Sequence, residues 1–310
     1  MRSLGGAATF CLVGAALHWS VPAVAQPEQI ANKDVYVLAE ELADEVELIR
    51  EVMGKPYDDS PRLPVAGVSM AEVFFQAQTL LRKSNQLARE LAGSALVTAP
   101  AAPNREIQAA DIYGIVKTAL EQIRAVKAEL GITEPVIPTE RETDIAPTGL
   151  FSTIIDSNRQ LNLLIERPIT SADVYEQITF AVIYTAGILA KLAPDAVVEP
   201  APFEGPKLPA DVYRRLLDCV DIVNRVARTE GVEVLSLSSR RNVPDDIKPG
   251  HVYDIANIVV ADIAVLAKVV GATPAEMDFA PKPKHIFPSH AYQRAGTLEK
   301  QLQALEAHVK

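Results

Sequence analysis

The chain is long enough for one large or two modest domains, and its charge is distinctly acidic. It has 310 residues and a formal net charge of −10 at pH 7, from 30 Lys and Arg against 40 Asp and Glu. An acidic surface repels phosphate backbones and anionic lipid head groups, which argues against nucleic acid and bare membrane as partners.

Residues 1–25 have the pattern of a secretory signal peptide. Arg2 supplies a positive start, residues 4–17 form a short apolar run, and Ala23-Val24-Ala25 gives a small-x-small cleavage pattern. A membrane anchor is the alternative, but the run is shorter than the roughly 20 apolar residues that a spanning helix needs. We therefore expect cleavage near Ala25, a periplasmic or secreted mature protein, and no stable membrane insertion of that mature chain.

A short signature then recurs eight times: a small, acidic or histidine residue, an aliphatic residue, and an aromatic ring that opens an apolar helical stripe. The rings are Tyr36, Phe74, Tyr113, Phe151, Tyr175, Tyr213, Tyr253 and Tyr292. They lie 38, 39 and 38 residues apart, then 24, then 38, 40 and 39. This repetition predicts an all-α fold of eight helices, each about 19 residues long, in two tandem four-helix repeat units. We expect the units to span residues 26–167 and 168–310.

Regular start and stop signals bound these helices. Four rings follow a proline by four residues, where a missing amide hydrogen costs little. These prolines are Pro147, Pro209, Pro249 and Pro288. Five helices meet a glycine 18 or 19 residues after the ring, as expected for a helix C-terminus. These glycines are Gly54, Gly93, Gly131, Gly231 and Gly271.

The links between helices are long and proline-rich, so helix direction is open. A fifteen-residue extended link reaches about 50 Å, whereas a 19-residue helix is about 28 Å long. We predict antiparallel up-down bundles because that topology is commoner; parallel helices with links strapped along the bundle are the alternative. The tight link at residues 167–170 predicts an antiparallel hairpin of the fourth and fifth helices. Residues 232–237 alternate like a short strand and are interpreted as an extended strap.

Polar residues at core positions are the first candidates for a ligand site. Asn158 lies seven residues after its ring, where the other helices carry Ala, Leu or Val except for Glu299 in the last. Ser84 and Thr185 replace aliphatic residues ten after theirs. Such residues usually set register or bond a neighbouring backbone. The alternative is a polar lining to an internal cavity.

Three asparagines flank the core eleven residues after their rings: Asn85, Asn162 and Asn224. Arg159 and Arg225 lie close to two of them. Exposed boundary positions explain this pattern, but amide and guanidinium donors would also suit an anionic ligand. A second candidate patch is the basic pair Arg240-Arg241, in a loop of an otherwise acidic protein. A positively charged loop on a negatively charged protein favours contact with a partner, although ordinary solvation of the two arginines explains their presence as well.

Metal and catalytic signatures are weak. No glycine-rich phosphate loop, haem-attachment motif or nucleophile elbow occurs. Pro288 separates His285 from His290, so the two histidines share no helical face. Signal cleavage would remove Cys11 and leave Cys219, which we interpret as a buried small hydrophobic residue. We expect no metal, no cofactor and no enzymatic activity.

The sequence therefore favours an exported, non-enzymatic helical-repeat protein that binds or scaffolds a partner protein in the cell envelope. The alternative is a periplasmic small-molecule carrier with a cavity inside a helix bundle. A third hypothesis is an enzyme whose site assembles across repeats. An exposed apolar or oppositely charged patch would favour the scaffold, and a closed cavity near the polar core residues would favour the carrier. Converging ionisable groups with shifted pKa values would favour the enzyme.

Overall fold

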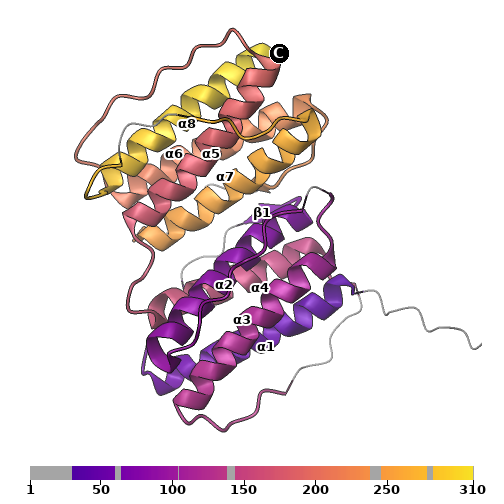
Figure 1. The fold of residues 1–310 in the computed structure, drawn as a ribbon, viewed down its shortest axis with the longest axis vertical. Helices are drawn as coiled ribbons and strands as arrows, with labels where there is room; N and C mark the ends of the chain where they lie inside the picture. The colour runs from indigo at the N-terminus through magenta and orange to yellow at the C-terminus, as the bar shows by residue number, and fades with distance from the viewer. Residues whose placement is uncertain are drawn as a thin grey trace, which may run out of the picture.

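The predicted all-α class is confirmed. The computed structural model describes residues 30–59, 64–103, 105–137, 144–237, 246–277 and 282–309. In these ranges the chain forms eight α-helices and one two-stranded sheet (Figure 1). The elements are α1 (Asn32–Val52), β1 (Val65–Ala66), α2 (Met70–Ala92), α3 (Ala109–Glu129), α4 (Pro147–Leu164), α5 (Ser171–Leu192), α6 (Pro209–Thr229), β2 (Ser236–Leu237), α7 (Pro249–Val270) and α8 (Pro288–Val309). The predicted signal peptide and the Arg240-Arg241 pair lie outside the described residues.

The helices begin and end where local chemistry places them. At the start of α2, the Ser69 hydroxyl accepts the Ala71 N–H (3.1 Å) and the Glu72 carboxylate accepts the Ser69 N–H (2.8 Å). This reciprocal pairing satisfies N–H groups that have no partner inside the helix. At the other end, Gly93 adopts a φ of 65°, which an L side chain rarely tolerates. All five predicted stop glycines have positive φ, so these helix ends are confirmed.

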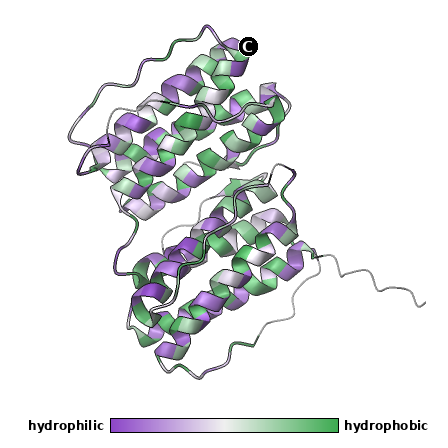
Figure 2. Cartoon of the chain, viewed as in Figure 1, coloured by the Kyte–Doolittle hydropathy of each residue, from purple (hydrophilic) through white to green (hydrophobic). Residues whose placement is uncertain are grey.

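The helices pack as two four-helix bundles, one above the other in Figure 1. In the first, α1 and α2 each contact α3 and α4; in the second, α5 and α6 each contact α7 and α8. Helices that follow one another in sequence therefore often lie diagonally across a bundle. Figure 2 shows hydrophobic and hydrophilic residues interspersed along the helices, as expected when one face of each is buried.

The helices of each bundle run parallel, so the antiparallel up-down prediction is wrong. Residues from the first turns of α5, α6, α7 and α8 line one small cavity, so these four helices begin together. In the first bundle, the Asn32 amide donates to the Ile145 carbonyl (3.1 Å), and α1 begins beside α4. The Gln86 amide donates to the Arg167 carbonyl (2.7 Å), so α2 and α4 end together. Parallel packing is feasible because an extended link covers more than 3 Å per residue and a helix only 1.5 Å.

The predicted hairpin of the fourth and fifth helices is also wrong. α4 packs on α1 and α2, whereas α5 packs on α7 and α8. The short link between them is the crossing from one bundle to the other (Figure 1). A tight link requires its two ends to be close, but it does not require the flanking helices to pack on each other.

Two asparagines predicted as ligand-binding residues hold links against the bundles. The Asn85 amide donates to the Val97 carbonyl (2.7 Å), and its oxygen accepts the Val97 N–H (3.2 Å). The Asn224 amide donates to the Leu235 carbonyl (2.9 Å). The prediction of an extended strap at residues 232–237 is confirmed in its last two residues, which form β2.

The two bundles meet along α2 and α7. β1, in the link after α1, pairs with β2 in antiparallel register, Val65 opposite Leu237. Along the helices, the Asn257 amide donates to the Thr79 hydroxyl (2.9 Å), and Glu72 lies within electrostatic reach of Asp262. Glu72 lies opposite Asp262 and Thr79 lies opposite Asn257, so contacts further along α2 fall earlier along α7. These two helices therefore run antiparallel. In the ranges described above, no helix combines the length and apolarity needed to cross a membrane.

Candidate functional site

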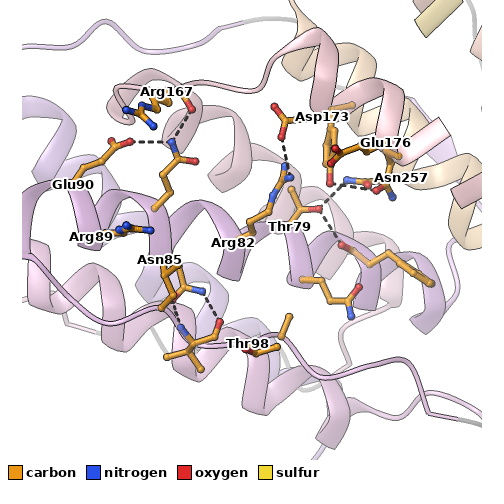
Figure 3. Close-up of a pocket in the computed structure, with 18 of the residues that line it drawn as sticks. Thr79, Arg82, Asn85, Arg89, Glu90, Thr98, Arg167, Asp173, Glu176 and Asn257 are labelled. Carbon is orange, nitrogen blue, oxygen red and sulfur yellow. Dashed lines mark hydrogen bonds and ion pairs between the residues drawn. The ribbon is translucent and has the colours of Figure 1, made fainter. Parts of the chain in front are cut away.

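A groove of about 940 Å³ lies between the bundles, alongside α2 (Figure 3). Its floor is one face of α2, because Phe75, Gln78, Arg82, Asn85 and Arg89 recur at helical spacing. One wall is the segment 96–99 in the link after α2, and the other comes from α5 and α7 of the second bundle. This volume is within the range of about 300–1,000 Å³ typical of ligand sites.

Three arginines from the first bundle line the groove. The Arg82 guanidinium lies 4.5 Å from the centre of the Tyr253 ring and 3.5 Å from the Asp173 carboxylate, so it joins the two bundles. Arg89 and Arg167 are exposed, and no carboxylate of the described residues lies within ion-pair distance of either. Figure 3 shows both at the same end of the groove, near Glu90. They are therefore open to an external anion.

Glu90 does not neutralise these two arginines through an ion pair. Its carboxylate accepts the backbone N–H of Glu166 (2.7 Å) and the amide of Gln86 (2.9 Å). Two donors already occupy this carboxylate, which holds the link between α4 and α5 against α2. The end of the groove therefore presents guanidinium groups whose hydrogen-bond donors face solvent.

Apolar side chains face the groove from both walls. Phe180 on α5 is 53% exposed, and Leu96 and Val97 in the link after α2 are 58% and 41% exposed. Exposed aromatic residues beside arginines are the composition that protein interfaces favour. The groove thus offers apolar contact along its walls and, at one end, two exposed guanidinium groups beside Glu90 and Glu166.

A second cluster of ionisable residues is buried where α2, α4 and α7 meet. Lys83 is 1% exposed, and its Nζ donates to the Asn158 carbonyl (3.0 Å). Burial lowers the pKa of Lys83 to about 8, with Asp254 opposing that shift. Burial likewise raises the pKa of Asp254, against the opposing charges of Lys83, Arg159 and His251. These residues lie within electrostatic reach of one another, and the Gln76 amide beside them donates to the Asp254 carbonyl (3.4 Å) across the two bundles.

A carboxyl pair forms a second buried polar contact between the bundles. Asp262 on α7 is fully buried, and Glu72 on α2 is 1% exposed. Burial raises the pKa of Asp262 well above its usual range, and the charge of Glu72 and a hydrogen bond with it raise it further. Glu72 also accepts the Leu235 N–H (3.2 Å). Glu72 on α2 thus lies within electrostatic reach of Asp262 on α7.

Most of the predicted ligand residues bond their neighbours. The Asn158 amide donates to the Gln76 carbonyl (3.2 Å), which joins α4 to α2. Thr185 belongs to the other bundle and donates to the Ala181 carbonyl one turn back (2.8 Å). Ser84 is buried next to Lys83, and its hydroxyl has no hydrogen-bond partner within the described chain. Asn158, Ser84 and Thr185 therefore do not come together around one cavity.

Two other predicted residues, Asn162 and Arg159, lie on α4 against the start of α7 and outside the groove lining. The Asn162 amide packs so closely against Gly250 that a Cβ there would lie 2.6 Å from it. Arg159 is 4% exposed and acts on Asp254 and His251 in the buried cluster. Of all the predicted site residues that the structure describes, Asn85 alone lines the groove. Sequence reasoning missed Arg89, Arg167 and Phe180, which have the pattern of an ordinary solvated helix or link.

The buried clusters do not form an accessible reaction site. Lys83, Asp254 and Asp262 expose at most 1% of their surfaces, so no substrate reaches them without separation of the bundles. Within the described ranges, no three His, Cys, Asp or Glu residues gather in a way that could hold a metal ion. Cys219 is fully buried, as predicted, and burial raises the pKa of its thiol.

The fold and the groove define this chain as an all-α protein of two four-helix bundles. The helices within each bundle run parallel, and an open groove that carries arginines lies where the bundles meet. No protein-family model, curated protein or solved structure matches the chain. Any function therefore has to be argued from its own residues.

Proposed function

We propose that this chain is an exported, non-enzymatic binding protein that holds a segment of a partner protein in the groove between its bundles. The observation that carries the proposal is the groove itself, with exposed Phe180 and Leu96 on opposite walls. At one end lie Arg89 and Arg167, which form no ion pair with the residues that the structure describes. Aromatic and arginine side chains supply most of the binding energy in typical interfaces.

The position of the groove also supports binding. Its walls come from both bundles, and the bundles are joined by the Asn257–Thr79 and Leu235–Glu72 hydrogen bonds and by the β1–β2 pair. A groove formed between two packed bodies needs little reorganisation on binding, which lowers the entropic cost of association. The signal-like residues 1–25 support export, so we propose that the partner belongs to the cell envelope or lies outside the cell.

A small-molecule carrier is the second candidate, because the groove volume falls in the range typical of ligand pockets. The ligand would then be an amphipathic acid in this groove. Native mass spectrometry of protein purified from its own host separates the two: an added mass of a few hundred daltons supports the carrier, and a bound polypeptide supports the partner-binding protein.

We predict that Arg89→Glu combined with Arg167→Glu abolishes retention of the partner. Reversing two charges turns attraction of a carboxylate into repulsion, which weakens binding by about 100-fold or more. The measurement is quantitative mass spectrometry of proteins co-purified with each variant from the source organism, at low and high salt, since screening weakens exposed charge pairs.

The matched control is Arg214→Glu combined with Arg228→Glu, two exposed arginines of α6 outside the groove lining. It changes the net charge by the same amount. A partner lost equally from both double variants, or retained by the groove variant, contradicts the proposal.

A further inference from the structure

The link after α2 carries backbone groups that nothing in the described chain binds. Val97 is held on both its N–H and its carbonyl by Asn85 (3.2 and 2.7 Å). In an extended chain, backbone groups of successive residues point to opposite sides. The N–H and carbonyl of Thr98 therefore point away from α2, and within the described residues they form no hydrogen bond. Thr98 lines the groove (Figure 3).

The link after α6 is held at its carbonyl in the same way, with the Leu235 N–H bound by Glu72 instead, and there the corresponding residues are paired. Leu235 lies four residues past Gly231 and is held by Asn224 (2.9 Å), as Val97 lies four past Gly93 and is held by Asn85. The next two residues, Ser236–Leu237, form β2 and pair antiparallel with β1.

Thr98 and Ala99 occupy the same place in the first bundle as the two residues of β2 in the second. No strand of the described chain pairs with them. The molecule therefore shows, in its own second bundle, that a link held in this way accepts a short antiparallel strand. In the first bundle that edge forms a wall of the groove.

We propose that the groove binds an extended acidic segment of the partner, which adds a strand to Thr98–Ala99. The inference rests on the proposed function and names the kind of segment that the groove takes. Backbone hydrogen bonds to an exposed edge supply affinity, and alternate side chains supply specificity. An acidic side chain pairs with Arg89 and Arg167, and an apolar side chain packs on Phe180. The charge preference follows from these two guanidinium groups, which form no ion pair within the described residues although Glu90 and Glu166 line the same groove.

The test uses peptides selected from a random display library on the mature chain, with the Arg89→Glu/Arg167→Glu variant as counter-selection. We expect acidic sequences with an apolar residue. Hydrogen–deuterium exchange should show slower exchange at the Thr98 amide in the complex. N-methylation of alternate peptide amides should weaken binding about tenfold, as expected for the loss of one or two backbone hydrogen bonds.

A protein variant gives the complementary readout. Thr98→Pro removes the N–H donor and should weaken peptide binding about tenfold, whereas Thr98→Ala keeps the backbone and should change it by less than about twofold. The N-methylated peptides give the same information if Thr98→Pro disturbs folding.

The outcomes separate the two claims. Peptides that need Arg89 and Arg167 but leave the Thr98 amide unprotected, and tolerate N-methylation, overturn the added strand and leave the groove as the binding site. Selected peptides that are neutral or basic overturn the acidic segment. Failure to select any peptide that distinguishes the chain from its Arg89→Glu/Arg167→Glu variant overturns both the inference and the proposed function.

Discussion

Replacement of Gly187 by alanine is expected to destabilise the protein by about 3 kcal/mol, the upper part of the range for an overpacked core. Gly187 lies in α5, where the link after α7 crosses the helix. A Cβ at this position would lie 1.9 Å from the Thr273 carbonyl oxygen and 2.9 Å from its carbon. Those atoms belong to backbone, and the Ala275 N–H is held by the Ile183 carbonyl (3.1 Å), so the link has little freedom to move away.

The measurement is chemical denaturation of the wild type and the variant. Gly114→Ala is the matched control, because Gly114 is an exposed helix glycine with nothing within 4 Å of its added Cβ. That control should stabilise the protein by about 0.5–1 kcal/mol through helix propensity. Equal effects of the two substitutions would contradict the packing of this link along the bundle, on which the parallel arrangement depends.

Asp262→Asn is expected to stabilise the protein, and the gain should increase with pH. The pKa of Asp262 is raised in the folded state, so its contribution to stability is complete below the unfolded pKa. It is lost as the pH rises towards the raised value. Each unit of upward shift corresponds to about 1.4 kcal/mol. An amide in the same place donates to Glu72 at every pH, and we expect a gain of about 2 kcal/mol near pH 8 and almost none near pH 4.

Urea denaturation across this pH range tests the prediction. Asp195→Asn, at an exposed position, is the control and should follow the wild type. A loss of stability in Asp262→Asn at alkaline pH would show that burial next to Glu72 does not disfavour the ionised Asp262 carboxylate in the folded state. Because this pair joins the two bundles, the result also reports on how the walls of the groove are held together.

Local signals in the sequence predicted the helices well, whereas the direction of the helices depended on competition between distant segments. Gly93 and Gly271 end their helices through backbone conformation, which a sequence reveals directly. The direction of α1 and α2 depends on whether a long link returns along the bundle. The length of the links permits both parallel and antiparallel helices. The prediction from the commoner antiparallel topology was wrong.

The polar core positions were noticed for a sound reason, but their partners could not be foreseen. Asn158 donates a hydrogen bond to the α2 backbone, and Asn85 and Asn224 donate to the backbone of links. Each bond gives a buried or partly buried amide a hydrogen-bond partner. One sequence signal for the contact between bundles was available. Glu72, Gln76, Thr79 and Lys83 form a polar stripe at helical spacing on α2, and that stripe is the face that packs on α7.

The groove itself could not be predicted from either bundle alone. Arg89 and Phe180 are exposed residues on separate helices, 91 positions apart. They line the same groove only because α2 packs on α7 and places α5 beside the link after α2. Surface residues of this kind look like solvated positions until the second bundle is in place.

The most direct test of the groove as the binding site is site-specific photo-crosslinking in the source organism. A photoreactive amino acid replaces Phe180 in the groove or, as control, Phe287, which is similarly exposed (59% against 53%) but lies outside the groove lining. We predict a discrete crosslinked polypeptide from position 180 that disappears with Arg89→Glu/Arg167→Glu, and none from position 287. The same polypeptide crosslinked from both positions, or no polypeptide from position 180, would contradict the assignment.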